Sequence, residues 1–137
     1  MLQDFIKNKL SAYIPHTPTT DQRNVIHAIA QFLQSNDDIF VLTGYAGTGK
    51  TTLIQSIVKT LEECNIPSVQ LAPTGRAAKV LCNYTQKTAS TIHKKIYKQT
   101  IIGGFPKFQL HYNNTPKAVF IVDEASMINK KIFQDII

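Results

Sequence analysis

Two short polar segments of this sequence have the residue types that hold phosphate and metal. Residues 44–51 read GYAGTGKT, and Gly44, Gly49, Lys50 and Thr51 fit the pattern G-x-x-x-x-G-K-[ST] at every position. Glycines let the backbone approach phosphate oxygens, and the start of a following helix adds partial positive charge. The segment predicts a phosphate-binding loop, with Lys50 at the terminal phosphates and the Thr51 hydroxyl as a Mg²⁺ ligand. The residues expected at the nucleotide here are Gly44, Ala46, Gly47, Thr48, Gly49, Lys50, Thr51 and Thr52.

The second segment places two adjacent acids after an apolar run. Residues 118–122 read AVFIV, and Asp123 and Glu124 follow them. A carboxylate at a strand end can hold Mg²⁺ through its water shell, and we assign this role to Asp123. Since the side chain of the next residue points elsewhere, Glu124 can orient or deprotonate a water that attacks the γ-phosphate. Lys50 and Glu124 are therefore the candidate catalytic residues, and the acid pair favours hydrolysis over transfer to a small acceptor.

Both segments need a scaffold that places them at strand ends. Apolar, β-rich runs predict buried strands at 39–43, 68–72 and 118–122. Helical spacing of apolar residues between these runs predicts an α/β fold, with a parallel sheet flanked by helices on both faces. Ligands bind such sheets at the carboxyl ends of the strands. We therefore expect three polar segments to converge on one edge of the sheet: 44–51, 73–76 and 123–126.

Helical spacing also predicts the remaining elements. One helix is expected before Pro15, and a second begins with Thr20 or Asp21 as its cap. Thr74 is a plausible cap for a later helix. Further helices are predicted over 53–64 and 88–97 and from about residue 129, and residues 108–112 alternate like a hairpin arm.

Composition limits the classes of protein that this chain can belong to. With 137 residues, 43% hydrophobic and 18% charged, the chain fits one folded domain rather than a disordered segment. The longest apolar run is far below the roughly 20 residues of a membrane span, and the N-terminus lacks a continuous signal-peptide core. We expect a cytoplasmic protein. Cys64 and Cys82 are too few for a disulfide scaffold and lack metal-ligand spacing, so we read them as small apolar residues.

The net charge of +6 favours polyanions as partners. The excess is most visible over 79–98, which holds five lysines and no acid. Such a run is also typical of a solvated helix face, so the charge alone leaves both interpretations open.

Four segments resemble the leading motifs of superfamily 1 DNA helicases: LTGYAGTGKTT, LAPTGRAAKVL, STIHKKIY and IVDEASMI. The group they resemble most is the RecD-like group of superfamily 1B, which includes the exodeoxyribonuclease V alpha subunit and Dda-type helicases. The resemblance covers residues 17–128. It implies a P-loop NTPase (RecA-like) fold, ATP and Mg²⁺ as cofactors, and single-stranded DNA as partner. DNA repair or recombination, with nuclease or recombination partners, is implied as well.

The resemblance also implies roles for five further residues. Gln22, in TTDQRNVI, is the adenine contact that it implies. Thr74 and Arg76 would line the single-strand track, and Thr91 and His93 would contact the same strand. For three of these positions the residues leave a second interpretation open: a surface glutamine, a solvated arginine and a structural histidine.

The same resemblance predicts the domain organisation. Residues 1–16 are expected as an N-terminal helix, and 17–137 as a partial RecA-like ATPase domain. Members of the group have a second RecA-like domain, whose arginines complete the ATP site and can be worth about 10³–10⁵ in rate. We expect this chain to be an N-terminal fragment of motor domain 1A, its sheet incomplete at the C-terminus. The alternatives are another P-loop NTPase or kinase, or a non-catalytic nucleotide- or DNA-binding module.

Overall fold

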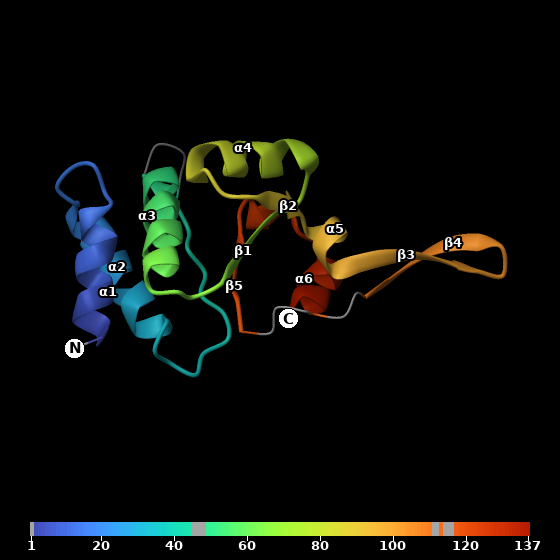
Figure 1. Ribbon diagram of the computed structural model, residues 1–137, viewed down its shortest axis with the longest axis horizontal. Helices are drawn as coiled ribbons and strands as arrows, with labels where there is room; N and C mark the ends of the chain where they lie inside the picture. The colour runs from blue at the N-terminus through green and yellow to red at the C-terminus, as the bar shows by residue number, and fades with distance from the viewer. Residues whose placement is uncertain (1, 45–48, 111–112, 114–116) are drawn as a thin grey trace. The chain divides into compact units, whose positions relative to one another are not determined.

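The computed structural model of the chain describes two compact units, residues 1–65 and 66–137, each with its own core (Figure 1). The described residues are 2–44, 49–110, 113 and 117–137. In this part of the chain no helix is long and apolar enough to cross a membrane.

The described residues of the first unit form three helices, as the spacing of its apolar residues predicted. They are α1 (Leu2–Ala12), α2 (Thr20–Phe32) and α3 (Lys50–Glu63), and α1 contacts both of the others. Their apolar faces form one core: Ile6, Leu10, Ile14, Ile26, Ile29, Ala30 and Leu53. Polar contacts tie α1 to α3, because the Ser56 hydroxyl donates to the Leu10 carbonyl at 2.5 Å and Lys9 pairs with Glu63 at 2.8 Å. The predicted boundary after residue 16 stays a prediction.

The start of α2 differs by one residue from the prediction of a Thr20 or Asp21 cap. Thr19 is the N-cap, because its hydroxyl accepts the Gln22 N–H at 3.2 Å. In return, the Gln22 side-chain oxygen accepts the Thr19 N–H at 3.0 Å. This reciprocal pair is a capping box, which satisfies two N–H groups at the start of the helix.

The strand predicted at 39–43 is wrong. These residues form neither a strand nor a helix, and Val41 is 74% exposed. Two of the apolar side chains pack elsewhere, since the Phe40 ring lies 5.5 Å from that of Phe32 on α2 and Leu42 packs against the helical core. A strand needs a hydrogen-bonded neighbour, and packing of this kind overrides β propensity.

The second unit contains a parallel sheet with the strand order β2-β1-β5. Its strands are β1 (Ser68–Ala72), β2 (Ala89–Thr91) and β5 (Val119–Val122). The helices α4 (Gly75–Thr85) and α5 (Ile92–Ile96) contact this sheet, so the predicted α/β class is confirmed. Two details differ: β2 and α5 replace the single helix predicted over 88–97, and β5 is half-buried rather than buried.

A short 3-10 helix, η1 (Ala125–Met127), and α6 (Lys130–Ile136) follow β5. The side chain of Asn129 caps α6, where a helix was expected from about residue 129. Side chains of α5, α6 and the strands share the second core, which centres on Leu71, Ile92 and Ile96. The helices after the strands are thereby held against the sheet.

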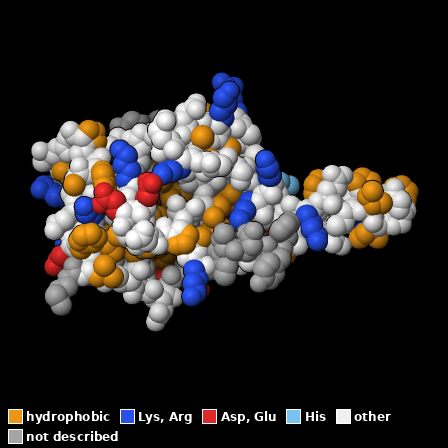
Figure 2. Space-filling model, viewed as in Figure 1, with side chains coloured by type: hydrophobic (Ala, Val, Ile, Leu, Met, Phe, Trp, Pro, Cys, Tyr) orange, Lys and Arg blue, Asp and Glu red, His pale blue; other side chains and the backbone are white. Residues whose placement is uncertain are grey.

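A two-stranded antiparallel hairpin completes this unit. It consists of β3 (Tyr97–Ile102) and β4 (Phe105–Leu110), so the hairpin arm predicted over 108–112 is confirmed for its described residues, 108–110. Figure 2 shows hydrophobic side chains along it, and five of them are largely exposed: Ile101, Ile102, Phe105, Phe108 and Leu110.

Candidate functional site

The described part of the phosphate-binding segment lies at the start of α3. Gly49, at φ +83°, is the N-cap of α3, and Lys50 is its first residue. The Lys50 ammonium donates to the Gly44 carbonyl oxygen at 2.6 Å, so this side chain reaches back to the first residue of the segment. Thr51 is exposed on the same helical turn, and Thr52 is half-buried. The other predicted loop contacts, Ala46, Gly47 and Thr48, lie outside the described residues.

Gln22 is brought close to this segment, although it is 27 residues away from Gly49 in the sequence. It is a buried side chain, 7% exposed. A Cβ added at Gly49 would lie 2.7 Å from the Gln22 side-chain nitrogen. The surface interpretation of Gln22 is therefore wrong. Because its oxygen already accepts the Thr19 N–H, the side chain has a fixed orientation.

In the second unit, strand register brings the polar segments after β1, β2 and β5 to one edge. Leu71 is paired with Val122, and Ala72 with Thr91. The prediction that 73–76 and 123–126 converge is thereby confirmed, because both segments start from paired strands. Segment 44–51 belongs to the other unit, and the described residues before it form no strand, so its convergence with the other two segments stays a prediction.

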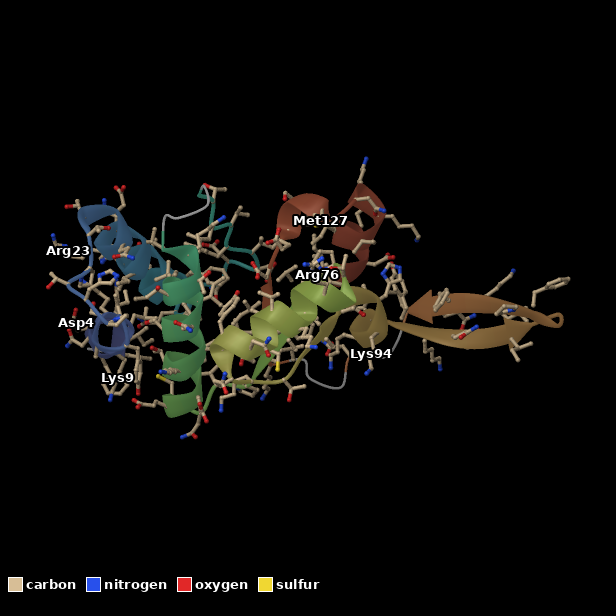
Figure 3. All side chains as sticks on the ribbon, turned by 90° about the horizontal axis from the view of Figure 1, so that it is seen from above. Asp4, Lys9, Arg23, Arg76, Lys94 and Met127 are labelled. Atoms are coloured by element: carbon tan, nitrogen blue, oxygen red, sulfur yellow. The ribbon has the colours of Figure 1, made fainter. Side chains whose placement is uncertain are left out.

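A pocket of about 220 Å³ lies at this edge. It is lined by Thr74, Arg76, Ala77, Val80, Asp123, Glu124 and Met127. In Figure 3 the labelled Arg76 on α4 and Met127 on η1 lie close together. The structure thus places the arginine expected at DNA beside the acid pair expected at ATP, within one unit.

Among the described residues, Asp123 makes hydrogen bonds to Leu71, Glu124 and Tyr84. Its N–H donates to the Leu71 carbonyl at 2.9 Å, which extends the pairing of β1 and β5. One carboxylate oxygen, Oδ1, accepts the Glu124 N–H at 3.0 Å, and the other, Oδ2, accepts the Tyr84 hydroxyl at 2.9 Å. Glu124 itself is exposed. Its backbone has φ +56°, in the left-handed region that few residues other than glycine adopt.

These residues fit a Mg²⁺ ion bound mainly by water and phosphate. Each carboxylate oxygen of Asp123 accepts one hydrogen bond and keeps a further lone pair for a ligand. Among the described residues there is no cluster of three or more His, Cys, Asp or Glu that could hold a metal alone. Mg²⁺ does not need one, because it usually keeps several waters and uses one or two carboxylates.

The two predicted DNA-contacting threonines cap helices. The Thr74 hydroxyl oxygen accepts the Ala77 N–H at 3.1 Å, and that of Thr91 accepts the Lys94 N–H at 3.2 Å. In each case the hydroxyl proton can still be donated to an acceptor such as a phosphate oxygen. The cap predicted at Thr74 is confirmed, whereas the capping role of Thr91 was not predicted.

His93 is exposed on α5 and belongs to an aromatic cluster. Its ring lies 5.0 Å from that of Tyr97 and 6.5 Å, edge-on, from that of Phe108. The Tyr97 hydroxyl donates to the Asp135 carboxylate of α6. This hydrogen bond is the main cause that raises the pKa of Tyr97 to about 12 and lowers the pKa of Asp135. The cluster lines a second pocket of about 360 Å³ with Leu110, Asn129, Lys131 and Ile132.

Tyr84 is a residue of the site that sequence reasoning missed. The available signal was helical spacing, because Ala77, Val80 and Tyr84 are three and four residues apart and share one face of α4. That face meets Asp123, which no pattern in the sequence indicates. The Tyr97–Asp135 pair was missed for the same reason, since its partners are 38 residues apart.

Comparisons with known proteins agree with the resemblance found in the sequence. A family model described as an AAA domain matches residues 19–137. The chain is 36% identical over 92 residues to the ATP-dependent RecD2 DNA helicase of Deinococcus radiodurans, which covers 66% of this chain and 12% of that protein. It is 33% identical over 120 residues to the ATP-dependent DNA helicase dda of Enterobacteria phage T4, over 85% of this chain and 27% of that protein. With the RecBCD enzyme subunit RecD of Haemophilus influenzae it is 29% identical over 151 residues, 92% of this chain and 23% of that protein.

Proposed function

Because this chain belongs to the AAA domain family, with the P-loop NTPase fold, and to the RecD-like helicases of superfamily 1B, we propose that it is part of an ATP-dependent DNA helicase. It would be the part that binds ATP and contacts single-stranded DNA. The chain spans only 12% to 27% of the three relatives named above, so the activity of the complete protein belongs to the proposal.

The observation that carries the proposal is the shared pocket at the strand ends of the second unit. Thr74 and Arg76 line it together with Asp123 and Glu124. A helicase has to make ATP hydrolysis depend on DNA. Because the two residue sets are adjacent, a DNA strand that contacts Thr74 and Arg76 can shift the acid pair. A small-molecule kinase has no need for this adjacency.

At the nucleotide, we assign Lys50 to the terminal phosphates, where its ammonium would exchange the Gly44 carbonyl for phosphate oxygens. Thr51 and Asp123 would hold Mg²⁺, which when bound neutralises charge on the phosphates. The Glu124 carboxylate would accept a proton from the attacking water. Gln22 would contact the adenine through its side-chain amide, whose orientation is fixed by the capping box.

At the DNA, the proposed contacts are Thr74, Arg76, Thr91 and His93. Helix starts offer N–H groups to phosphates, and the two threonines lie at the starts of α4 and α5. Exposed aromatic rings can stack on bases without regard to sequence, which suits the cluster around His93. We therefore expect weak sequence preference and strong dependence of affinity on salt.

We also propose that the complete protein has the further domain and the partner proteins that the resemblance implies. We propose a second RecA-like domain that completes the ATP site with its arginines, and residues 17–137 as the matching part of the first domain. Nuclease or recombination partners and a cytoplasmic location remain part of this proposal.

The test is ATP hydrolysis by the complete protein, measured with and without oligo-dT. We expect hydrolysis that oligo-dT stimulates and that Asp123→Asn abolishes. Turnover that is insensitive to DNA but requires a small-molecule acceptor would identify a kinase instead. If neither a labelled ATP analogue nor labelled oligo-dT binds, the proposed function is wrong.

A further inference from the structure

Hydrogen bonds to both oxygens fix the orientation of the Asp123 carboxylate, and one of them comes from a side chain on another element. Oδ1 is held by the N–H of the next residue, Glu124, at 3.0 Å. Oδ2 is held by the Tyr84 hydroxyl at 2.9 Å, from a residue 39 positions earlier in the chain. Without the hydrogen bond from Tyr84, the Asp123 carboxylate could rotate about its last side-chain torsion more freely, because only Oδ1 would still be held.

The place of Tyr84 on α4 is set by packing. Ala77 and Val80, on the same helical face, line the pocket that Asp123 and Met127 also line. Tyr84 follows Val80 by four residues, so its ring continues this face. The tyrosine is half-buried, and its hydroxyl reaches a carboxylate that lies directly after β5.

In the hydrogen bond between Tyr84 and Asp123, the tyrosine hydroxyl is the donor and the carboxylate oxygen Oδ2 is the acceptor. The bond therefore leaves a lone pair on Oδ2 for a ligand and does not neutralise the carboxylate.

We propose that Tyr84 is a positioning residue for the metal-binding aspartate: it holds the Asp123 carboxylate in the orientation that a divalent cation needs. Partners that orient a metal ligand from the outer shell typically matter about 10–100-fold in metal affinity or activity. Because Tyr84 lies on α4, whose first turn carries Thr74 and Arg76, the residue also joins that helix to the aspartate. This inference rests on the proposed function, which assigns Mg²⁺ to Asp123.

The experiment measures binding of Mn²⁺, a paramagnetic stand-in for Mg²⁺, to the complete protein by electron paramagnetic resonance. The protein is saturated with a non-hydrolysable ATP analogue. Tyr84→Phe removes only the hydroxyl, and we expect it to weaken Mn²⁺ binding by roughly 10-fold or more. Binding of the labelled analogue in EDTA should stay within twofold of the wild type, because in this assignment Tyr84 acts on the metal ligand and not on the nucleotide.

Tyr97→Phe is the matched control, since it also removes a tyrosine hydroxyl that donates to an aspartate in the same unit. A merely structural role for Tyr84 would lower the melting temperature of both variants and leave Mn²⁺ affinity unchanged in both. That outcome overturns the inference, provided that Asp123→Asn weakens Mn²⁺ binding. If Asp123→Asn leaves Mn²⁺ binding unchanged as well, the metal assignment in the proposed function has failed rather than the role of Tyr84 alone.

Discussion

In residues 2–65 the candidate phosphate-binding side chains lie at the start of helix α3, whereas in 66–137 the candidate metal and DNA residues follow strands paired in parallel. Lys50 is placed by its own helix and by the hydrogen bond to the Gly44 carbonyl. Asp123 needs the register of β1 against β5 and the hydroxyl of Tyr84 from α4. A site at a helix start is built locally, so a motif predicts it well, whereas a site at strand ends depends on which strands become neighbours.

Lys50→Ala tests the local site, and we expect the largest effect there. ATP hydrolysis by the complete protein should fall by roughly 10²–10³-fold, the usual cost of removing one donor that stabilises transition-state charge. Lys59→Ala, on the same helix, is the control, because the Lys59 ammonium lies over the Tyr13 ring rather than at the loop. DNA-stimulated turnover that survives Lys50→Ala would remove Lys50 from the site.

Gly49→Ala tests the backbone of the same site. A residue with a Cβ at φ +83° costs about 1–2 kcal/mol, and the new methyl group would displace the Gln22 amide from its capping box. The free energy of unfolding, measured by urea denaturation, should fall by at least this amount. Gly75→Ala, at the start of α4, should cause no loss, since a Cβ there meets nothing within 4 Å. Equal effects of the two changes would contradict the special conformation of Gly49.

Arg76→Gln tests the strand-end site through DNA. Affinity for oligo-dT should fall, and the slope of log affinity against log salt should become shallower by about 0.7, the value for one phosphate contact on a single strand. Arg23→Gln is the control, since Arg23 is the other arginine of the sequence and lies in the helical unit. An unchanged slope would leave Arg76 as an ordinary solvated arginine.

The hydrogen bond between Tyr97 and Asp135 should show the smallest effect, as a pH-dependent contribution to stability. The pKa of Tyr97 is raised to about 12, so its contribution is complete below pH 10 and is lost as pH rises from about 10 to about 12. The pKa of Asp135 is lowered, so its contribution is present above the ordinary value of about 4 and is lost on acidification.

The melting temperature of Tyr97→Phe should accordingly lie a few degrees below the wild type between about pH 5 and pH 9. The difference should shrink at either extreme, which circular dichroism at pH 3, 7 and 11 would measure. A difference that is the same at all three pH values would assign the effect to lost packing instead.

Much of the fold could be predicted from local patterns. The strand at 68–72 and the helices α1, α3 and α6 lie close to where apolar spacing and caps placed them. The predicted strand at 39–43 failed because Phe40 and Leu42 found partners on the helices of their own unit. The helix predicted from residue 88 begins only at Ile92, because the three residues before it form β2 and pair with β1. Pairing between distant segments leaves no local pattern in the sequence.

The sequence by itself determined the chemistry of this protein. Gly44, Lys50 and Thr51 have fixed spacings along one loop and helix, and Asp123 is adjacent to Glu124, so covalent connection alone keeps these groups together. Only the tertiary structure decided that Arg76 shares a pocket with the acid pair and that the Tyr84 hydroxyl holds the Asp123 carboxylate. Those neighbours arise from strand register and helix packing, which sum many weak contacts between residues far apart in the chain.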